Sequence, residues 1–317
     1  MECTSKALRV VYGDFTLGVH GEGFDYIFSY AQGGLESIVK NGYEWLYRCP
    51  KPTFWRALTD NDRGSKFHIK SGSWLAADMF IDCKDVEVIT DGVSQGKPVA
   101  PENNKYGADV FAENVIVKYI YETITTPMTT VEVTYDVASN GKITVDVLYK
   151  GAKGLPELPV FGLRFIMPTL ADKYMYEGLS GETYPDRMAG AVKGVYEIND
   201  LSLTPYLVPQ ECGMRMGTDW LEVTRHTSLN NSRKDNSAQT LRIEKKEDTF
   251  AFSCLPYTAS EIENATHHEE LPPARRTVLC VYGAVRGVGG IDSWGSDVEE
   301  AYHINAEEDI TYSFVIC

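Results

Sequence analysis

The chain has 317 residues, of which 43% are hydrophobic, 24% charged and 11% aromatic, the composition of a soluble globular protein rather than a disordered or fibrous one. Its formal net charge of −15, from 45 acidic and 30 basic residues, would repel a nucleic-acid backbone or an anionic membrane surface. No stretch approaches the roughly 20 apolar residues of a membrane span, and the first residues do not resemble a signal peptide, so we expect a cytoplasmic protein.

Strand patterns begin near the N-terminus and are clearest in the region 114–149. Residues 8–12, 15–19 and 26–30 predict three early strands because they are rich in β-branched and aromatic residues. Three runs of the later region then alternate with period two. The expected buried faces are Val115, Val117, Tyr119 and Tyr121; Val131, Val133, Tyr135 and Val137; and Ile143, Val145, Val147 and Tyr149.

The turn between the second and third of these runs contains Asn140-Gly141, which supplies the positive backbone angles of a tight hairpin. The region is therefore predicted to be an antiparallel meander with one buried face. Further strands are expected at 160–167, 241–245, 250–254, 277–284 and 310–316.

Helix signals are few, and the clearest is Thr258-x-x-Glu261, a capping box that opens a run toward His268. We expect one or two short helices. No repeat, low-complexity segment or Ser- or Pro-rich linker divides the chain. The sequence thus predicts an all-β fold, a large antiparallel β-sandwich, as a single domain over residues 1–317.

The cysteines argue against a disulfide framework. They stand at scattered positions (3, 49, 83, 212, 254, 280 and 317) and form no CxxC pair. We expect reduced thiols, most of them buried.

The sequence does not single out candidate catalytic residues. Tyr and Trp in an acidic protein suggest sugar binding only weakly, since core aromatics are commoner. Glycoside hydrolysis usually needs two carboxylates about 5 to 9 Å apart. Carboxylates cluster at Asp60 with Asp62, at Glu182 with Asp186, at Glu211 and at Asp292, but none of these forms an evident acid and nucleophile pair. No catalytic residue is assigned to this chain.

Metal and nucleotide sites are disfavoured for similar reasons. The run Asp60-Asn61-Asp62-Arg63-Gly64 offers oxygen ligands but lacks the later Glu of an EF-hand, so a turn capped by its own side chains is favoured over a calcium loop. His267 and His268 would point some 100° apart on a helix, and we expect surface or helix-end histidines. The segment 287–290 is glycine-rich without matching GxGxxG, so its glycines are expected to let the chain turn sharply beside Trp294.

Five segments together resemble signatures of one family. They are TFWRALTDNDRG at 53–64, GETYPDR at 181–187, TPYLVPQE at 204–211, PYT at 256–258 with His267, and GVGGIDSW at 287–294. Their order and spacing resemble the C-terminal domain of lactose-cleaving β-galactosidases, from about Leu8 to Val315. That extent is similar to the separately encoded small subunits of the heterodimeric β-galactosidases of lactic acid bacteria.

The resemblance implies a galactose-mutarotase-like sandwich packed beside a (β/α)8 barrel that carries both catalytic glutamates. Because this chain lacks the barrel, it would be a non-catalytic subunit. Its partner, the large subunit, would supply the acid/base, the nucleophile and the magnesium and sodium sites, and this chain would bind no metal or cofactor. The galactoside substrate would lie at the shared site.

The same resemblance assigns roles to particular residues. Trp294, in the Asp-Ser-Trp motif, corresponds to a tryptophan that forms a wall of the galactoside pocket. Gly64 corresponds to the hinge of a loop that opens and closes around ligand, and the mobile part would begin with Ser65, Lys66, Phe67 and His68. Arg56, Asp60, Asn61 and Asp62 are expected to brace that loop.

Two departures from the family pattern affect Glu182 and Glu211. Ser180-Gly181-Glu182 is shorter than the Gly-Pro-x-Glu of many relatives, and Gly217-Thr218-Asp219-Trp220 replaces a second Arg-Trp pair. We therefore expect ion-paired structural roles for both glutamates, with Arg187 or Arg215. Two alternatives stay open: a free-standing mutarotase or epimerase with its own acid and base, and a structural or carbohydrate-binding module.

Overall fold

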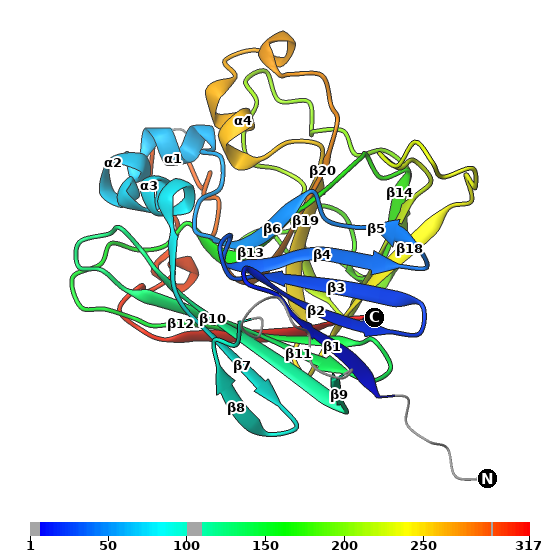
Figure 1. Cartoon of the computed structure of the whole chain (residues 1–317). Coiled ribbons are helices and arrows are strands. Elements are labelled where there is room, and N and C mark those ends of the chain that lie inside the picture. The colour runs from blue at the N-terminus through cyan, green and yellow to red at the C-terminus, as the bar shows by residue number, and fades with distance from the viewer. Residues whose placement is uncertain (1–6, 100–109, 293) are drawn as a thin grey trace.

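The computed structural model describes residues 7–99, 110–292 and 294–317, and it is built from three antiparallel sheets (Figure 1). The first sheet has the order β5 (Tyr43–Glu44), β4 (Gly34–Lys40), β3 (Phe24–Ser29), β2 (Thr16–Gly21), β1 (Leu8–Tyr12) and β9 (Val110–Ala112). The second has the order β15 (Lys193–Ile198), β14 (Lys173–Leu179), β17 (Trp220–Arg225), β18 (Gln239–Lys245), β21 (Ile310–Ile316), β12 (Ile143–Tyr149), β11 (Thr130–Ala138), β10 (Asn114–Glu122), β7 (Asp82–Thr90) and β8 (Val93–Gly96). The third has the order β16 (Arg215–Thr218), β19 (Phe250–Leu255), β20 (Thr277–Val285), β13 (Val160–Met167) and β6 (Arg48–Thr53).

The predicted meander is confirmed as β10, β11 and β12. The odd-numbered residues from Val115 to Tyr149 on these strands are buried, and their neighbours in sequence are partly exposed. Gly141 has a φ of +79° in the hairpin between β11 and β12. Period-two patterning therefore sets both the buried face and the strand pairing here.

The third sheet is covered on both faces, which explains the continuous apolar runs of β19 and β20. Phe252, Leu279 and Val281 belong to the main core, together with residues of the other two sheets. Ala251, Cys280 and Tyr282 belong to a second cluster on the opposite face, with Tyr184, Met214 and Val288 packed into or against it. The sheet thus supports loops on its outer side, including those that hold the signature residues.

The large antiparallel sandwich is confirmed, but the expected number of helices is wrong. Four short α-helices are described, α1 (Asp60–Gly64), α2 (Phe67–Ser71), α3 (Ser73–Phe80) and α4 (Ala259–Asn264), with 3-10 turns η2 (His268–Glu270) and η3 (Glu300–Tyr302). The predicted capping box at Thr258 is confirmed as the start of α4. The expected turn at Asp60 is instead α1, because Thr59 and Asp62 form a capping box in which Asp takes the usual place of Glu or Gln.

Strand β6 was not predicted from the sequence. It contains Pro50 and Pro52, which cannot donate backbone hydrogen bonds, and proline is tolerated in this sheet because β6 lies at its edge. The cysteines agree with the expectation: Cys49, Cys212, Cys254 and Cys280 are free and buried, Cys83 and Cys317 are free and partly buried, and Cys3 lies outside the described residues.

Candidate functional site

A buried ion-pair cluster fixes the first of the predicted site segments. Asp62 receives two hydrogen bonds from the Arg56 guanidinium, at 2.6 and 3.1 Å, and its carboxylate also accepts the Thr59 N–H at 2.9 Å. Both charged side chains are almost fully buried. Burying them is tolerated because each charge is paired and hydrogen-bonded. The cluster anchors the N-terminus of α1 to the segment that follows β6.

Arg286, at the end of β20, extends this cluster to the segment after Trp294. Its guanidinium pairs with Asp62 at 3.4 Å, forms a short hydrogen bond with Asp297 and lies 4.0 Å above the ring of Phe67. Partial burial opposes ionisation of Asp297, yet hydrogen bonds from Arg286 and Lys70 lower the pKa of its carboxyl. One buried cation therefore connects α1, α2 and the Trp294 segment.

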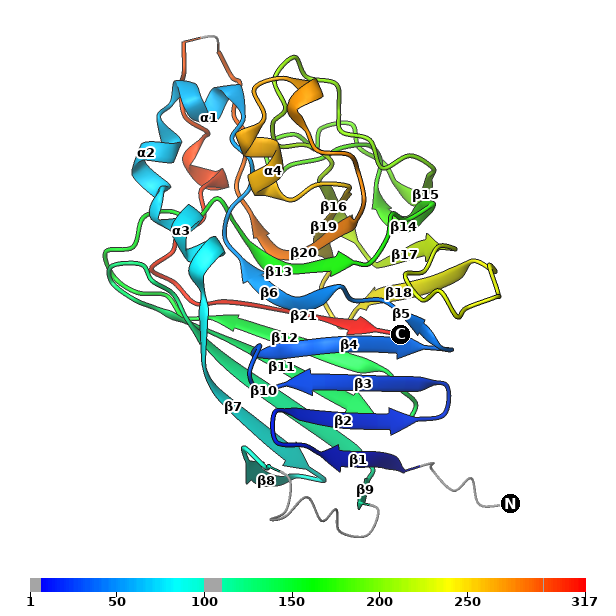
Figure 2. The same cartoon turned by 45° about the horizontal axis from the view of Figure 1, so that its top comes forward.

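The segment that carries Trp294 touches α1 through backbone atoms. A side chain on Gly64 would lie 3.1 Å from the Cα of Gly295, and a side chain on Gly295 would lie 2.9 Å from the Gly64 carbonyl. Asp292 accepts the backbone N–H of Trp294 at 2.9 Å. Figure 2 shows this loop, which contains the undescribed Ser293, above α1. Two glycines thus permit an approach that any side chain would block.

Trp294 itself is 91% exposed, so it is not a core residue. The expected turning of the glycine-rich segment is confirmed at Gly289 and Gly290, which have positive φ angles; Gly295, which was not predicted, has one too. The exposed indole is therefore available to a ligand or to a partner chain.

The residues predicted to form the mobile loop lie between and within two helices. Gly64 ends α1, Ser65 caps it and Lys66 has a φ of +60°, which turns the chain into α2. Phe67 is buried beneath Arg286, whereas the neighbouring Ile69 is exposed. That this segment opens and closes stays a prediction.

A cavity of about 630 Å³ beside α1 brings signature segments together, and we call it the Glu211 cavity. It is lined by Thr59, Asp60, Asn61, Glu182, Tyr184, Arg187, Thr204, Tyr206, Gln210, Glu211, Val288, Gly289 and Gly290. These residues come from four of the five stretches that carry the family resemblance. The motifs identified each stretch in the sequence, but they did not indicate that the four stretches meet at one cavity.

The walls of the Glu211 cavity are held by hydrogen bonds to the glycine-rich strip 287–290. The Asp186 carboxylate accepts the N–H groups of Val288 and Gly289, the latter at 2.8 Å. Arg187 donates to the Gly289 carbonyl, and the Asn61 amide donates to the Val288 carbonyl at 3.0 Å. The strip is therefore fixed from two sides, by the 181–187 segment and by α1.

The ion pairs expected for Glu182 and Glu211 are wrong. Among the described residues neither forms a salt bridge with Arg187 or Arg215: Glu182 accepts the Thr204 hydroxyl at 2.7 Å, and Glu211 accepts the Tyr184 hydroxyl at 3.3 Å. Burial, opposed by nearby Arg56 and reinforced by Glu182, raises the pKa of Glu211 to about 8. Tertiary contacts place these carboxyls beside a cavity rather than in ion pairs.

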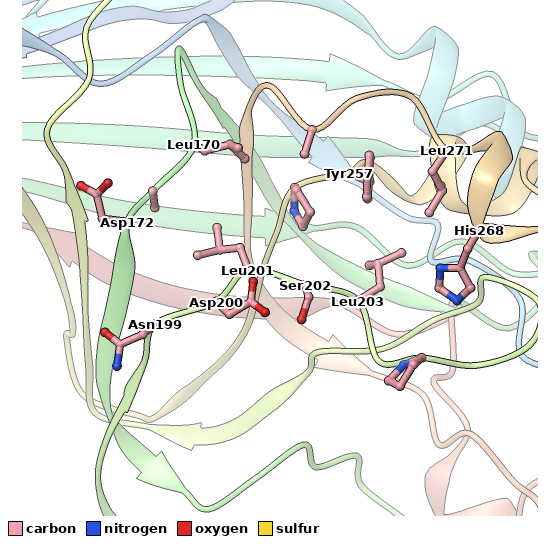
Figure 3. A pocket seen from close by; sticks show the side chains of 14 residues that line it. Leu170, Asp172, Asn199, Asp200, Leu201, Ser202, Leu203, Tyr257, His268 and Leu271 are labelled. Carbon is pink, nitrogen blue, oxygen red and sulfur yellow. The ribbon is translucent and has the colours of Figure 1, made fainter.

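A second cavity, of about 550 Å³, is lined by residues that include Leu203 and Pro205, from the same chain segment as Thr204 and Tyr206 (Figure 3). Leu201, Leu203 and Leu271 make its surface largely apolar. His268 is at its edge, with Nε2 placed to donate to the Tyr206 carbonyl at 2.6 Å, and His267 is exposed next to Glu270. Both histidines are thus surface residues at a short helical turn, as expected.

Two further observations concern ions and membranes. Within the described ranges, no three His, Cys, Asp or Glu side chains are grouped so that they could hold a metal ion. In the same part of the chain, no helix is long and apolar enough to span a bilayer.

The comparisons with known proteins agree on one family. A family model described as β-galactosidase small chain matches residues 20–316. The chain is 58% identical to the β-galactosidase small subunit of Latilactobacillus sakei, over 100% of this chain and 99% of that protein. It is 34% identical to a β-galactosidase of Halalkalibacterium halodurans and 32% identical to one of Streptococcus thermophilus, each over 98% of this chain but only 28% and 27% of those proteins.

Among solved structures, the chain is similar to a galactose 1-epimerase from Lactobacillus acidophilus NCFM, with 8% identity, a TM-score of 0.40 and coverage of 95% of this chain and 93% of that one.

The family model matches nearly the whole chain, and the alignment with the Latilactobacillus sakei protein spans almost the full length of both proteins. This chain therefore belongs to the β-galactosidase small chain family.

Proposed function

We propose that this chain is the non-catalytic small subunit of a heterodimeric β-galactosidase. In this proposal it completes the binding site for terminal β-D-galactosides such as lactose, and the large subunit carries both catalytic glutamates of a retaining mechanism. Trp294 is the observation that carries the proposal, because its exposed indole can cover the apolar face of a pyranose.

The fixed backbone around Trp294 supports a binding role. Asp292 bonds to the Trp294 N–H, and Gly295 lies against Gly64, so the indole is presented from a defined position. A backbone that is already held in place loses little conformational freedom when its side chain binds a ligand. Binding energy gathered at Trp294 would position the sugar for attack by a nucleophile of the other chain.

Exposed apolar side chains on α2, on α3 and beside Trp294 support a partner surface. Ile69 on α2, Met79 and Phe80 on α3, and Ile291 beside Trp294 are all exposed. Lys70 pairs with Asp297 at 3.1 Å, which ties α2 to the Trp294 loop. Exposed apolar side chains of this kind are available to a partner, and we assign them to contact with the large subunit.

Chemistry at the shared site would follow the retaining pathway. The large subunit's nucleophile would form a galactosyl-enzyme as the glycosidic bond breaks and the general acid of the same subunit protonates the departing group. Water or a second sugar would then take up the galactosyl group and free the nucleophile. Magnesium and sodium are assigned to the large subunit. This chain would contribute Trp294 and the segment that starts at Gly64, and both would exclude water from the sugar. Free thiols at all six described cysteines support a reducing, cytoplasmic location.

Reconstitution with the large subunit tests the proposal. Each chain is assayed alone and in a mixture with a chromogenic galactoside, and only the mixture is expected to hydrolyse it. Trp294→Leu is expected to raise KM in the mixture at least tenfold, because the indole surface is lost, while both chains still elute together in size-exclusion chromatography.

Phe15→Leu is the matched control, because Phe15 is also an exposed aromatic residue but precedes β2, far along the chain from the site segments. It should leave the kinetics unchanged. Unchanged kinetics for Trp294→Leu would remove Trp294 from the site. Hydrolysis or mutarotation by this chain alone would contradict the non-catalytic role.

A further inference from the structure

We propose that the Glu211 cavity is a second carbohydrate-binding site, contained wholly within this chain, for a neutral hexose or a polyol of similar size. This second site goes beyond the proposed role of Trp294, since ligand binding there requires neither the large subunit nor the Trp294 indole. The cavity volume of about 630 Å³ lies within the usual range of small-molecule sites.

Glu211 provides the first reason. Its side chain lines the cavity but is only 8% exposed, and among the described residues its carboxyl group takes part in one hydrogen bond, with the Tyr184 hydroxyl. The other carboxyl oxygen has no hydrogen bond among the described residues and is not among their buried unpaired atoms, so it is accessible from the cavity. A ligand hydroxyl in the cavity can therefore bond to it.

The remaining lining fits a sugar. Glu182 bonds to Thr204 through one carboxylate oxygen, and no hydrogen bond within the described residues occupies the other. Tyr206 lines the cavity and is 41% exposed, so its ring surface is available to a ligand. Carboxyl groups that bind hydroxyls, combined with aromatic rings that cover C–H faces, are the chemistry that recognises pyranoses.

The charges of the cavity disfavour an anion. Asp60 and Glu182 line it and outnumber the one lining cation, Arg187, which also donates to the Gly289 carbonyl. Arg56, behind the cavity, is paired with Asp62. A neutral polyol is favoured further because its hydroxyls both donate and accept, and so suit Glu211 whether or not the carboxyl is protonated.

The cavity is also built in advance of any ligand. Asp186, Arg187 and Asn61 hold the glycine strip in place, and Gln210 accepts the Asp60 N–H at 3.0 Å across the opposite side. Gly290 has a φ of +80°, and a side chain there would come within 2.8 Å of the Asn61 amide. Preformed walls lower the entropy cost of binding a small rigid ligand.

Binding of galactose and of glucose to the full chain, without the large subunit, tests the inference. Titrations are followed by protein-detected NMR for the wild type, Glu182→Gln, Tyr206→Ala and Trp294→Leu, with thermal melting to show that each variant folds. Saturable binding of either sugar is expected in the wild type and in Trp294→Leu, and at least tenfold weaker binding is expected in Glu182→Gln and Tyr206→Ala.

Three results would overturn the inference. The first is no saturable binding up to about 100 mM sugar, which corresponds to a binding free energy of less than 1.4 kcal/mol on a 1 M standard state. The second is sugar binding that is lost in Trp294→Leu but kept in Glu182→Gln, and the third is saturable binding of calcium or magnesium that Glu182→Gln abolishes and that sugar does not displace. The second result would still agree with the proposed function. Failure of the reconstituted assay would leave this second site standing, so the two proposals are tested separately.

Discussion

Asp62 is the residue whose replacement should affect stability most sharply. It is the shared partner of Arg56 at 2.6 Å and Arg286 at 3.4 Å, and both guanidiniums are almost fully buried. In Asp62→Asn the shape is kept, but Arg56 loses its counter-charge, whereas Arg286 keeps its ion pairs with Glu157 and Asp297. Breaking a buried ion pair from one side costs about 3–5 kcal/mol, so we expect the free energy of unfolding to fall by about that amount.

Asp60→Asn is the matched control for this experiment. Asp60 lies two residues away on the same helix, its side chain is 73% exposed, and its ion pair with Arg63 spans 3.6 Å. Exposed pairs of this kind contribute only about 0–1 kcal/mol. Urea denaturation of the wild type and both variants at pH 7 measures the difference. If the two substitutions differed by less than about 1 kcal/mol, the argument that Asp62 neutralises the buried cluster would be refuted.

Two other predictions use the same region. The pKa of Glu211 is raised by burial from 4.5 to about 8, so the folded chain should hold this proton more tightly than the unfolded chain, and stability should fall as pH rises between these two values. Glu211→Gln should remove that part of the pH dependence, and urea denaturation at pH 5 and pH 8.5 checks it against Glu269→Gln, a change at an exposed carboxylate; equal pH dependence in both variants would contradict the assignment. Gly295→Ala should reduce galactoside hydrolysis by the reconstituted enzyme at least tenfold, because Gly295 has a φ of +84° and lies against the Gly64 backbone; a Gly92→Ala control, strained at φ +78° but in open space, should lose stability without losing activity.

Period-two patterning was sufficient to predict strands and their buried faces where one face of a sheet is buried and the other is not. The strands β1, β12 and β21 have the predicted bounds, and the meander β10 to β12 has the predicted buried face. In such strands the chemistry of alternate residues is itself the signal. The helices α1 to α3 could not be found in the same way, because α1 and α2 have only five residues each, too few for a helical period to show.

Motif resemblance identified the family and the residues of the Trp294 loop, and the comparisons confirm the family. It did not indicate that Gly64 and Gly295 meet, although each glycine was visible in the sequence. That contact depends on the buried cluster of Arg56, Asp62 and Arg286, which holds the two segments together.

The sequence by itself determined the all-β class and the meander register, because these depend on local patterns. Only the tertiary structure decided where the signature segments converge. Glu182 and Glu211 were expected in ion pairs, yet folding places them beside a cavity with Tyr184 and the glycine strip. Burial and distance between segments more than 100 residues apart are properties of the packed chain, so no local pattern could report them.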